Sequence, residues 1–271
     1  MTDQIESKKF PPFSYEKGFC WVSEKYKLIF LPIPKNASTS IRNIEEFQFQ
    51  VDNAFRYRTL IESGEYKMFT VIREPLDRFV SGYIEICKRA YGDSTQILKR
   101  DFYWIKDEKR RFHKFVEEVE GSFFDVHIRP QSYFLTDYEN NFFNIDFALD
   151  FHSIQKSFND LLNRYNLKMV ELPKKNIRST IEKNISSRMS KKLENLFSIF
   201  LRLWDSDKKH KVHIRLAIYL LLDKAAHILP RRPLPDKNEV HAILQNEHDL
   251  VARLDVLYKD DWLLYNRKNI T

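Results

Sequence analysis

The order of apolar and polar residues predicts a buried strand that leads directly into a helix. Residues 26–33 form a nearly continuous apolar run, as in a strand buried on both faces of a parallel sheet. A short polar loop comes next. Ile41, Ile44 and Phe47 then recur at helical spacing, which predicts a helix over residues 38–48.

A second strand and helix follow. Residues 66–72 predict another buried strand, and Pro75 favours the first position of a helix. We expect the apolar face of this helix to consist of Phe79, Val80, Tyr83, Ile84 and Cys87. We expect the polar face to hold Asp77, Arg78, Ser81, Glu85 and Lys88.

The rest of the pattern is mostly helical. Residues 108–121 and 153–165 predict amphipathic helices, with a strand between them at 142–151. Residues 1–25 show no period and are expected to be irregular. The predicted fold class is therefore α/β: a P-loop-like parallel sheet flanked by helices, with a helical C-terminal part, in a single domain over residues 1–271.

Composition narrows the setting and the partners. The chain of 271 residues can bury a sizeable core, and its formal net charge of +7 favours anionic partners such as nucleotides or acidic glycans. Cys20 and Cys87 are far apart and have neither zinc nor redox spacing. The N-terminal segment has no apolar signal core, and the longest apolar run is too short to span a bilayer. If Met1 is the true start, we expect a cytoplasmic protein that can associate with a membrane surface.

The polar loop after the first strand has the chemistry of an anion site. A helix N-terminus offers free N–H groups and the positive end of the helix dipole. Lys35 adds a full charge, Asn36 tolerates a left-handed turn, and Ala37 allows close approach of the backbone. Hydroxyl donors follow at Ser38, Thr39 and Ser40. We predict a phosphate or sulfate cradle, the alternative being an ordinary corner with a surface lysine.

The order of residues in this loop argues against a nucleoside-triphosphate site. Such loops read G-x-x-x-x-G-K-[ST], with the lysine directly before the hydroxyl that holds magnesium. Here Lys35 comes first and the loop contains no glycine. A P-loop nucleotide kinase or NTPase stays open as an alternative, because residues 144–146 could form a magnesium-holding strand end.

A second candidate group follows the second strand. Arg73 stands at the carboxyl end of that strand, where ligands of open α/β sheets bind, and Ser81 is on the polar side of the next helix. A guanidinium offers a bidentate fork to a phosphate, and serine adds a neutral donor. By itself, the stretch also fits a capped amphipathic helix.

Together these stretches resemble the carbohydrate sulfotransferases of the chondroitin and dermatan type, which use 3′-phosphoadenosine 5′-phosphosulfate (PAPS). Residues 34–40 are similar to their P-K-x-A-S/C-T-S loop, and residues 73–81 to their R-[ED]-P-x-x-R-x-x-S motif. Three later stretches match in the same order. Residues 125–131 resemble the family's H-x-x-P segment, 176–180 its late R-x-T loop, and 258–265 its closing Y-x-x-D-[FYW]-x-x-[FY] helix.

The resemblance implies transfer of a sulfuryl group from PAPS to a sugar hydroxyl of a glycan or glycolipid, with 3′-phosphoadenosine 5′-phosphate (PAP) as product and no required metal. It implies that Lys35 neutralises charge on the leaving oxygen and that residues 36–40 hold the other oxygens. Arg73 and Ser81 would bind the 3′-phosphate. The late loop would close the site through Arg178, Ser179 and Thr180.

The acceptor hydroxyl also needs a general base. We predict His127 for this role, because imidazole accepts protons near neutral pH and the residue lies in a motif position. The alternative is a structural histidine that orients the turn before Pro130. Other candidate bases are His113, His152, Glu45 and Glu46.

The remaining expectations concern partners. Residues 188–236 exceed the family pattern and predict a helical insertion, which is either an extra packed hairpin or an element that docks the acceptor. Its basic stretch, 208–232, suggests peripheral contact with a membrane or a lipid-linked sugar.

A basic nucleic-acid-binding protein is a further alternative. We expect no nucleic-acid partner, because the basic residues are dispersed and no binding motif accompanies them.

Overall fold

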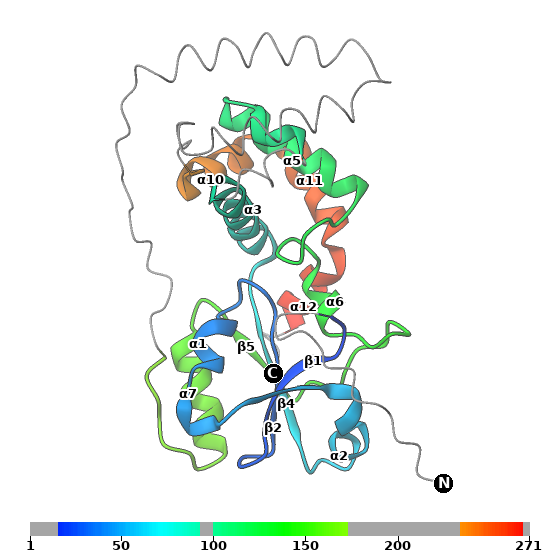
Figure 1. Ribbon diagram of the computed structural model, residues 1–271, viewed down its shortest axis with the longest axis vertical. Helices are drawn as coiled ribbons and strands as arrows, with labels where there is room; N and C mark the ends of the chain where they lie inside the picture. The colour runs from blue at the N-terminus through cyan, green and yellow to red at the C-terminus, as the bar shows by residue number, and fades with distance from the viewer. Residues whose placement is uncertain (1–15, 93–99, 173–233, 268–271) are drawn as a thin grey trace. The chain divides into compact units, whose positions relative to one another are not determined.

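The computed structural model describes three stretches of the chain, residues 16–92, 100–172 and 234–267 (Figure 1). These residues cluster into two compact units. The first unit takes in the described parts of 1–79, 123–177 and 252–271, and the second those of 80–122 and 178–251. The single domain expected from the sequence stays a prediction.

The first unit is built on a five-stranded sheet with the order β3-β1-β2-β4-β5. Its strands are β1 (Phe19–Ser23), β2 (Leu28–Leu31), β3 (Gln50–Asn53), β4 (Lys67–Ile72) and β5 (Phe147–Asp150). The three strands β2, β4 and β5 run parallel, with Phe30 beside Phe69 and Phe69 beside Phe147. Every residue of β2 is buried, as its apolar run predicted. The predicted α/β fold with parallel central strands is confirmed.

One side of the sheet differs from the prediction. Strand β1 lies in the stretch that was expected to be irregular, and it pairs antiparallel with both β2 and β3. The sheet is therefore mixed rather than wholly parallel. The apolar run of β1, residues 19–22, is a signal of the same kind as that of β2, but the sequence analysis did not use it.

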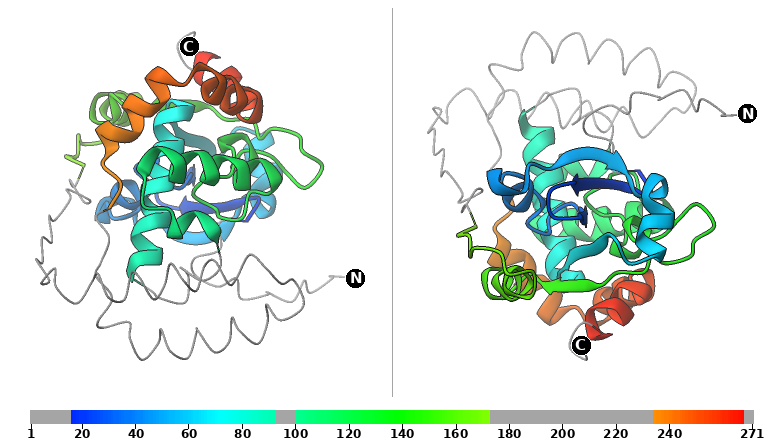
Figure 2. Two further views of the ribbon diagram at one scale, coloured as in Figure 1. Left: turned by 90° about the horizontal axis from the view of Figure 1, so that it is seen from above. Right: turned by 90° about the horizontal axis from the view of Figure 1, so that it is seen from below.

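Helices cover both faces of this sheet (Figures 1 and 2). They are α1 (Ser38–Arg42) and α7 (Ile154–Arg164) on one face, and α2 (Arg58–Glu62), α6 (Gln131–Phe134) and α12 (Lys259–Arg267) on the other. Phe30, Phe69 and Phe158 form the centre of the first layer. Ile29 and Met68 belong to the second layer. Strands β2 and β4 therefore send alternate side chains into two separate cores.

The first helix ends earlier than predicted, whereas the closing helix is present. Helix α1 stops at Arg42, and a 3-10 turn, η1 (Glu45–Phe47), continues in place of the expected helix to residue 48. Ile44 and Phe47 are still buried, because a spacing of three suits a 3-10 turn as well as an α-helix. The closing helix expected over residues 258–265 is present as α12, and a further helix, α11 (His248–Leu257), precedes it.

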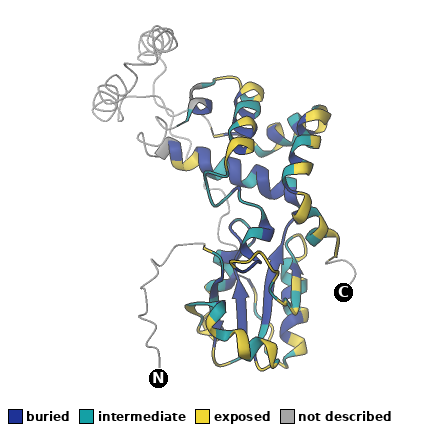
Figure 3. Ribbon diagram, turned by 90° about the vertical axis from the view of Figure 1, so that its right-hand side faces the viewer, coloured by how far each residue is buried: buried dark blue, intermediate teal, exposed yellow. Residues whose placement is uncertain are grey.

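The second unit is helical. It holds most of α3 (Pro75–Gly92), η3 (Asp101–Trp104), α5 (Glu108–Gly121), α10 (Lys237–Asn246) and the first residues of α11. The bounds of α5 confirm the predicted helix at 108–121. Of the apolar face predicted for α3, Phe79, Val80, Tyr83 and Cys87 are buried, but Ile86 is buried where Ile84 was expected. The burial colouring shows the strands of the sheet mostly in dark blue (Figure 3). Tyr83 donates a hydrogen bond to Glu108 Oε1 at 2.6 Å and accepts one from Arg111 Nε at 3.0 Å.

Part of the prediction lies outside the described residues. This applies to the late loop with Arg178, Ser179 and Thr180, to the basic stretch 208–232, and to all but the last residues of the insertion at 188–236.

Candidate functional site

The loop between β2 and α1 has a left-handed backbone at two positions. Lys35 has a φ of 72° and Ala37 a φ of 56°. The sequence prediction placed the left-handed turn at Asn36 and was wrong. Non-glycine residues adopt this region at a cost, and such strain gathers at functional sites. The loop is therefore held in shape by contacts outside itself.

Asn36 supplies one of those contacts. Its side chain is fully buried, and Nδ2 donates to the Val71 carbonyl oxygen at 2.7 Å and to Gln131 Oε1 at 2.6 Å. The amide ties the loop to the end of β4 and to α6. Sequence reasoning took Asn36 for a turn residue, whereas it works through its side chain.

Donors for an anion gather at the start of α1. The backbone N–H groups of Ala37, Ser38 and Thr39 donate no hydrogen bond to another residue in the described part of the chain. Ser38 is buried, and the side chains of Lys35 and Thr39 are partly exposed. The loop thus brings a lysine and several N–H groups together, as predicted for an anion cradle.

Arg73 links this loop to the end of β4. It is only 6% exposed, and its Nη1 donates to the Lys35 carbonyl oxygen at 2.8 Å. Nε and Nη2 both lie 2.7 Å from Asp77 Oδ2, and the guanidinium is 4.2 Å from the centre of the Phe151 ring. Burial lowers the pKa of Arg73, and the Asp77 carboxylate opposes that shift. Arg73 therefore keeps its charge in the interior beside a paired carboxylate.

The first turn of α3 also corrects the predicted polar face. Asp77 and Arg78 were placed on the solvent side, but both are buried. Asp77 pairs with Arg73, and Arg78 Nε donates to the Pro34 carbonyl oxygen at 3.2 Å. The helix begins at the sheet edge beside the loop, so Asp77 meets a guanidinium and Arg78 meets backbone carbonyls instead of water.

Gln131 joins several of these groups and was missed by sequence reasoning. Its Oε1 accepts from Asn36 Nδ2 and from the Arg73 backbone N–H, the latter at 3.1 Å. Its Nε2 donates to the Arg73 carbonyl oxygen at 2.8 Å. The available signal was its place directly after Pro130 in the H-x-x-P stretch. Gln131 therefore couples that stretch to the Lys35 loop.

His127 forms a dyad with Asp125. His127 Nδ1 lies 2.8 Å from Asp125 Oδ1, which also accepts from the His127 backbone N–H at 2.9 Å. A proton on Nδ1, held by this carboxylate, leaves Nε2 as the acceptor. The D-x-H spacing was a usable signal for Asp125, which the sequence analysis did not name. Among the rival bases, Glu45, Glu46 and His152 are exposed, and His113 belongs to the second unit.

Ser81 belongs to the second unit, where its side chain is partly buried on α3. Its predicted role beside Arg73 stays a prediction.

The comparison with known proteins adds the family. A sequence model described as the Sulfotransferase family matches residues 20–215, which include the Lys35 loop, Arg73 and the Asp125–His127 dyad. The chain belongs to the Sulfotransferase family. It is therefore an enzyme that transfers a sulfuryl group. No curated protein and no solved structure matches the chain.

The kinase alternative loses its main support in this sulfotransferase. Asp146 was its candidate magnesium ligand, but its Oδ2 accepts from the Met68 backbone N–H at 2.8 Å and its Oδ1 lies 3.1 Å from Lys67 Nζ. These contacts place Asp146 at the amino end of β4, whereas Arg73 follows its carboxyl end. At about 3.3 Å per residue, a strand of this length separates the two edges by well over 10 Å.

Two properties of the described residues bear on metal binding and on membranes. No group of three or more His, Cys, Asp or Glu side chains in these stretches could hold a metal ion. None of the helices described for this sulfotransferase combines enough length with enough apolar character to cross a bilayer.

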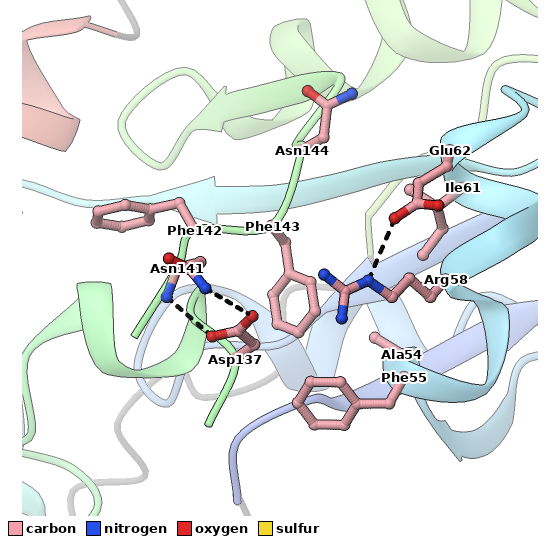
Figure 4. A pocket seen from close by; sticks show the side chains of 10 residues that line it. All are labelled: Ala54, Phe55, Arg58, Ile61, Glu62, Asp137, Asn141, Phe142, Phe143 and Asn144. Atoms are coloured by element: carbon pink, nitrogen blue, oxygen red, sulfur yellow. Dashed lines mark hydrogen bonds and ion pairs between the residues drawn. The ribbon is translucent and has the colours of Figure 1, made fainter. Parts of the chain in front are cut away.

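A cavity of about 180 Å³ opens elsewhere in the first unit of the sulfotransferase (Figure 4). Phe55, Phe142 and Phe143 contribute to its walls. Arg58 on its rim pairs with Glu62 at 3.2 Å. Its lining contains none of the residues predicted for the sulfuryl donor, so it carries no part of the predicted chemistry.

Proposed function

We propose that this sulfotransferase moves a sulfuryl group from PAPS to a sugar hydroxyl of a glycan or glycolipid and releases PAP. The observation that carries the proposal is the loop at 34–40. There Lys35 accompanies the N–H groups of Ala37, Ser38 and Thr39, which donate to no other described residue. Such a cradle fits a tetrahedral anion that carries several oxygens.

The loop would stabilise the leaving group. Lys35 would neutralise the charge that develops on the oxygen between sulfur and the 5′-phosphate. The other oxygens would be held by the loop N–H groups and by the hydroxyls of Ser38, Thr39 and Ser40. Asn36 would shape the loop around them. A sulfuryl group carries less charge than a phosphoryl group, so these donors can act without a bound metal.

Arg73 would bind the 3′-phosphate. Asp77 and the Lys35 carbonyl oxygen engage three of its five N–H groups, which leaves two for a phosphate. The motif pairs Arg73 with Ser81 and assigns closure of the site to Arg178, Ser179 and Thr180. The ion pair with Asp77 would keep the guanidinium pre-oriented before the ligand arrives.

His127 would act as the general base. Its Nε2 would take the proton of the acceptor hydroxyl while a new S–O bond forms to the sugar oxygen and the S–O bond to the 5′-phosphate breaks. The dyad with Asp125 supports this role, because it holds Nδ1 as the protonated nitrogen and stabilises the imidazolium that results.

The acceptor class rests on the resemblance to carbohydrate sulfotransferases and on the net charge of +7, which suits an anionic glycan. A lipid-linked sugar would add peripheral membrane contact through residues 208–232.

The deciding experiment is calorimetric titration with PAP, with AMP and magnesium-ATP as controls. We expect tight binding that requires the 3′-phosphate and weakens at least about tenfold in Lys35→Ala and in Arg73→Lys. Arg58→Ala, which removes an exposed arginine on the cavity rim, is the matched control and should bind normally. A preference for magnesium-ATP, or equal binding by all variants, would overturn the proposal.

Turnover would then be measured with radiolabelled PAPS and a panel of chondroitin, dermatan and lipid-linked sugar acceptors. Transfer to a sugar hydroxyl supports the acceptor class, whereas transfer only to non-carbohydrate hydroxyls would contradict it.

A further inference from the structure

Arg78 touches the backbone beside both predicted catalytic residues. Its side chain is fully buried, Nε donates to the Pro34 carbonyl oxygen at 3.2 Å, and Nη1 donates to the Arg129 carbonyl oxygen at 2.7 Å. Pro34 directly precedes Lys35, and Arg129 comes two residues after His127. One planar, rigid group therefore spans the two segments that carry the predicted chemistry.

The segment after His127 is also fixed from its other side. Asp261 is fully buried, and its two oxygens accept from the backbone N–H groups of Gln131 at 2.7 Å and Ser132 at 2.9 Å. The Tyr258 hydroxyl donates to the Ile128 carbonyl oxygen. Burial lowers the pKa of Arg78, and the nearby Asp261 carboxylate opposes that shift. The charge of Arg78 is thus balanced from the last helix while its N–H groups stay available to the two carbonyls.

The arrangement is not the one that stability alone would favour. Arg78 Nη2 is buried and meets no hydrogen-bond partner in the described part of the chain, which costs free energy. The charge of Arg73 adds repulsion. A well-packed apolar side chain at a buried ionic position is often tolerated as well as the ion or better. What an apolar side chain cannot supply is two hydrogen bonds at a fixed separation.

We propose that Arg78 is a positioning residue, which holds the Lys35 loop and the His127 segment at the separation that sulfuryl transfer needs. This inference rests on the proposed function, because it assigns roles to Lys35 and His127. Arg78 itself touches neither reacting group. Its loss should therefore reduce turnover far more than it reduces the affinity for PAP.

The first test compares Arg78→Lys with wild type. Lysine keeps a positive charge but lacks the planar fork that can reach both carbonyls. We expect kcat to fall about 10- to 100-fold, the scale that a small misplacement of reacting groups produces, with a much smaller change in PAP affinity. Arg111→Lys is the matched control: Arg111 is also buried but belongs to the Tyr83–Glu108 network of the second unit. This control should retain turnover per folded molecule.

A second readout separates positioning from general destabilisation. In a double-mutant cycle, adding Arg78→Lys to His127→Ala should lower kcat little further, because the base that Arg78 positions is already absent. If Arg78 had a purely structural role, the losses in kcat of the two single variants would multiply in the double variant. Turnover of Arg78→Lys within about twofold of wild type, or multiplied losses in the cycle, would overturn the proposal.

Hydrogen–deuterium exchange tests the same link without turnover. In Arg78→Met, the hydrogen-bonded amides of the two segments should exchange at least about tenfold faster, while those of β2 and β4 stay protected. These amides belong to Asn36, His127, Ile128, Gln131 and Ser132. Arg111→Lys should leave both segments unchanged. Unaltered exchange in Arg78→Met would overturn the link between the segments. Absence of PAP binding by wild type would instead overturn the proposed function, and exchange would still decide whether Arg78 couples the two segments.

Discussion

Arg73 Nη1 donates a 2.8 Å hydrogen bond to the carbonyl oxygen of Lys35. The arginine proposed for the 3′-phosphate thus also holds the backbone of the lysine proposed for the leaving group. The two proposed functions of the donor site share one guanidinium, so a ligand that orders Arg73 would also order the Lys35 loop.

The Arg73–Asp77 pair should contribute strongly to stability. We expect Arg73→Ala and Asp77→Ala each to lower the free energy of unfolding by about 3–5 kcal/mol, because each leaves a buried charge without its partner. The double variant should lose less unfolding free energy than the two single variants lose together. Urea denaturation measures the stability of all three variants.

The matched control is Arg58–Glu62, which has the same i,i+4 spacing and is well exposed to solvent. Removing either partner there should cost no more than about 0.5 kcal/mol. Equal losses of unfolding free energy at the buried and the exposed pair would contradict the importance that we assign to burial.

Position 36 should tolerate neither the loss of the amide side chain nor its replacement by a charged carboxylate. Asn36→Ala should cost about 1–3 kcal/mol, because it removes the side-chain donor to the Val71 carbonyl oxygen and one of the two donors to Gln131 Oε1, which keeps the Arg73 backbone N–H. Asn36→Asp should cost more at neutral pH, since a carboxylate would face two acceptors. Thermal unfolding measures both, and the exposed Asn43→Ala should remain close to wild type. An Asn36→Asp protein as stable as wild type at pH 7 would show that these hydrogen bonds are absent.

The Asp125–His127 dyad should act as a unit. His127→Ala should lower kcat about 10²- to 10⁴-fold, and Asp125→Asn should lower it by a smaller factor while PAP binding persists. The exposed His248→Ala serves as the control, and His152→Ala tests the rival base. Near-normal turnover of His127→Ala would remove this residue from the mechanism.

The left-handed backbone at Ala37 predicts opposite outcomes for two substitutions. Ala37→Gly should change stability by less than about 1 kcal/mol, because relief at a φ of 56° offsets the greater freedom of glycine in the unfolded chain. Ala37→Val should cost roughly 2 kcal/mol, since a β-branched side chain fits this region poorly. Chemical denaturation measures both. Ala252→Val on the exposed side of α11 is the control, and a loss there as large as at Ala37 would contradict the explanation.

Both thiols should be unreactive in the folded protein. Burial raises the pKa of Cys87 to about 12 and raises that of Cys20 well above its ordinary value. Because the folded state keeps these protons, stability should be unaffected below about pH 9 and should fall above it, by up to about 1.4 kcal/mol per pH unit for each thiol. Thiol labelling at pH 8 and urea denaturation between pH 8 and 10 measure the two effects. Cys87→Ala should reduce the alkaline slope, and rapid labelling of the native protein would contradict the prediction.

The sequence by itself determined the central strands, the position of the Lys35 loop between β2 and α1, and the long amphipathic helix at 108–121. These features follow from local patterns: an apolar run for β2 and β4, a lysine with hydroxyls before a helix, and a helical period for α5. A shorter apolar run at residues 19–22 forms β1, which lies in the stretch expected to be irregular.

Only the tertiary structure decided which polar residues lie inside. The helical period placed Asp77 and Arg78 on the solvent face, and the turn preference of asparagine suggested a left-handed Asn36. Asn36 and Arg78 are buried because their partners, the carbonyls of Pro34, Val71 and Arg129 and the side chain of Gln131, come from other elements. Asp77 is buried against Arg73, which follows the end of β4. A local pattern records the polarity of a side chain. Whether that side chain meets water or a distant carbonyl depends on which segments the fold brings together, and a buried polar group is stable only where such partners meet it.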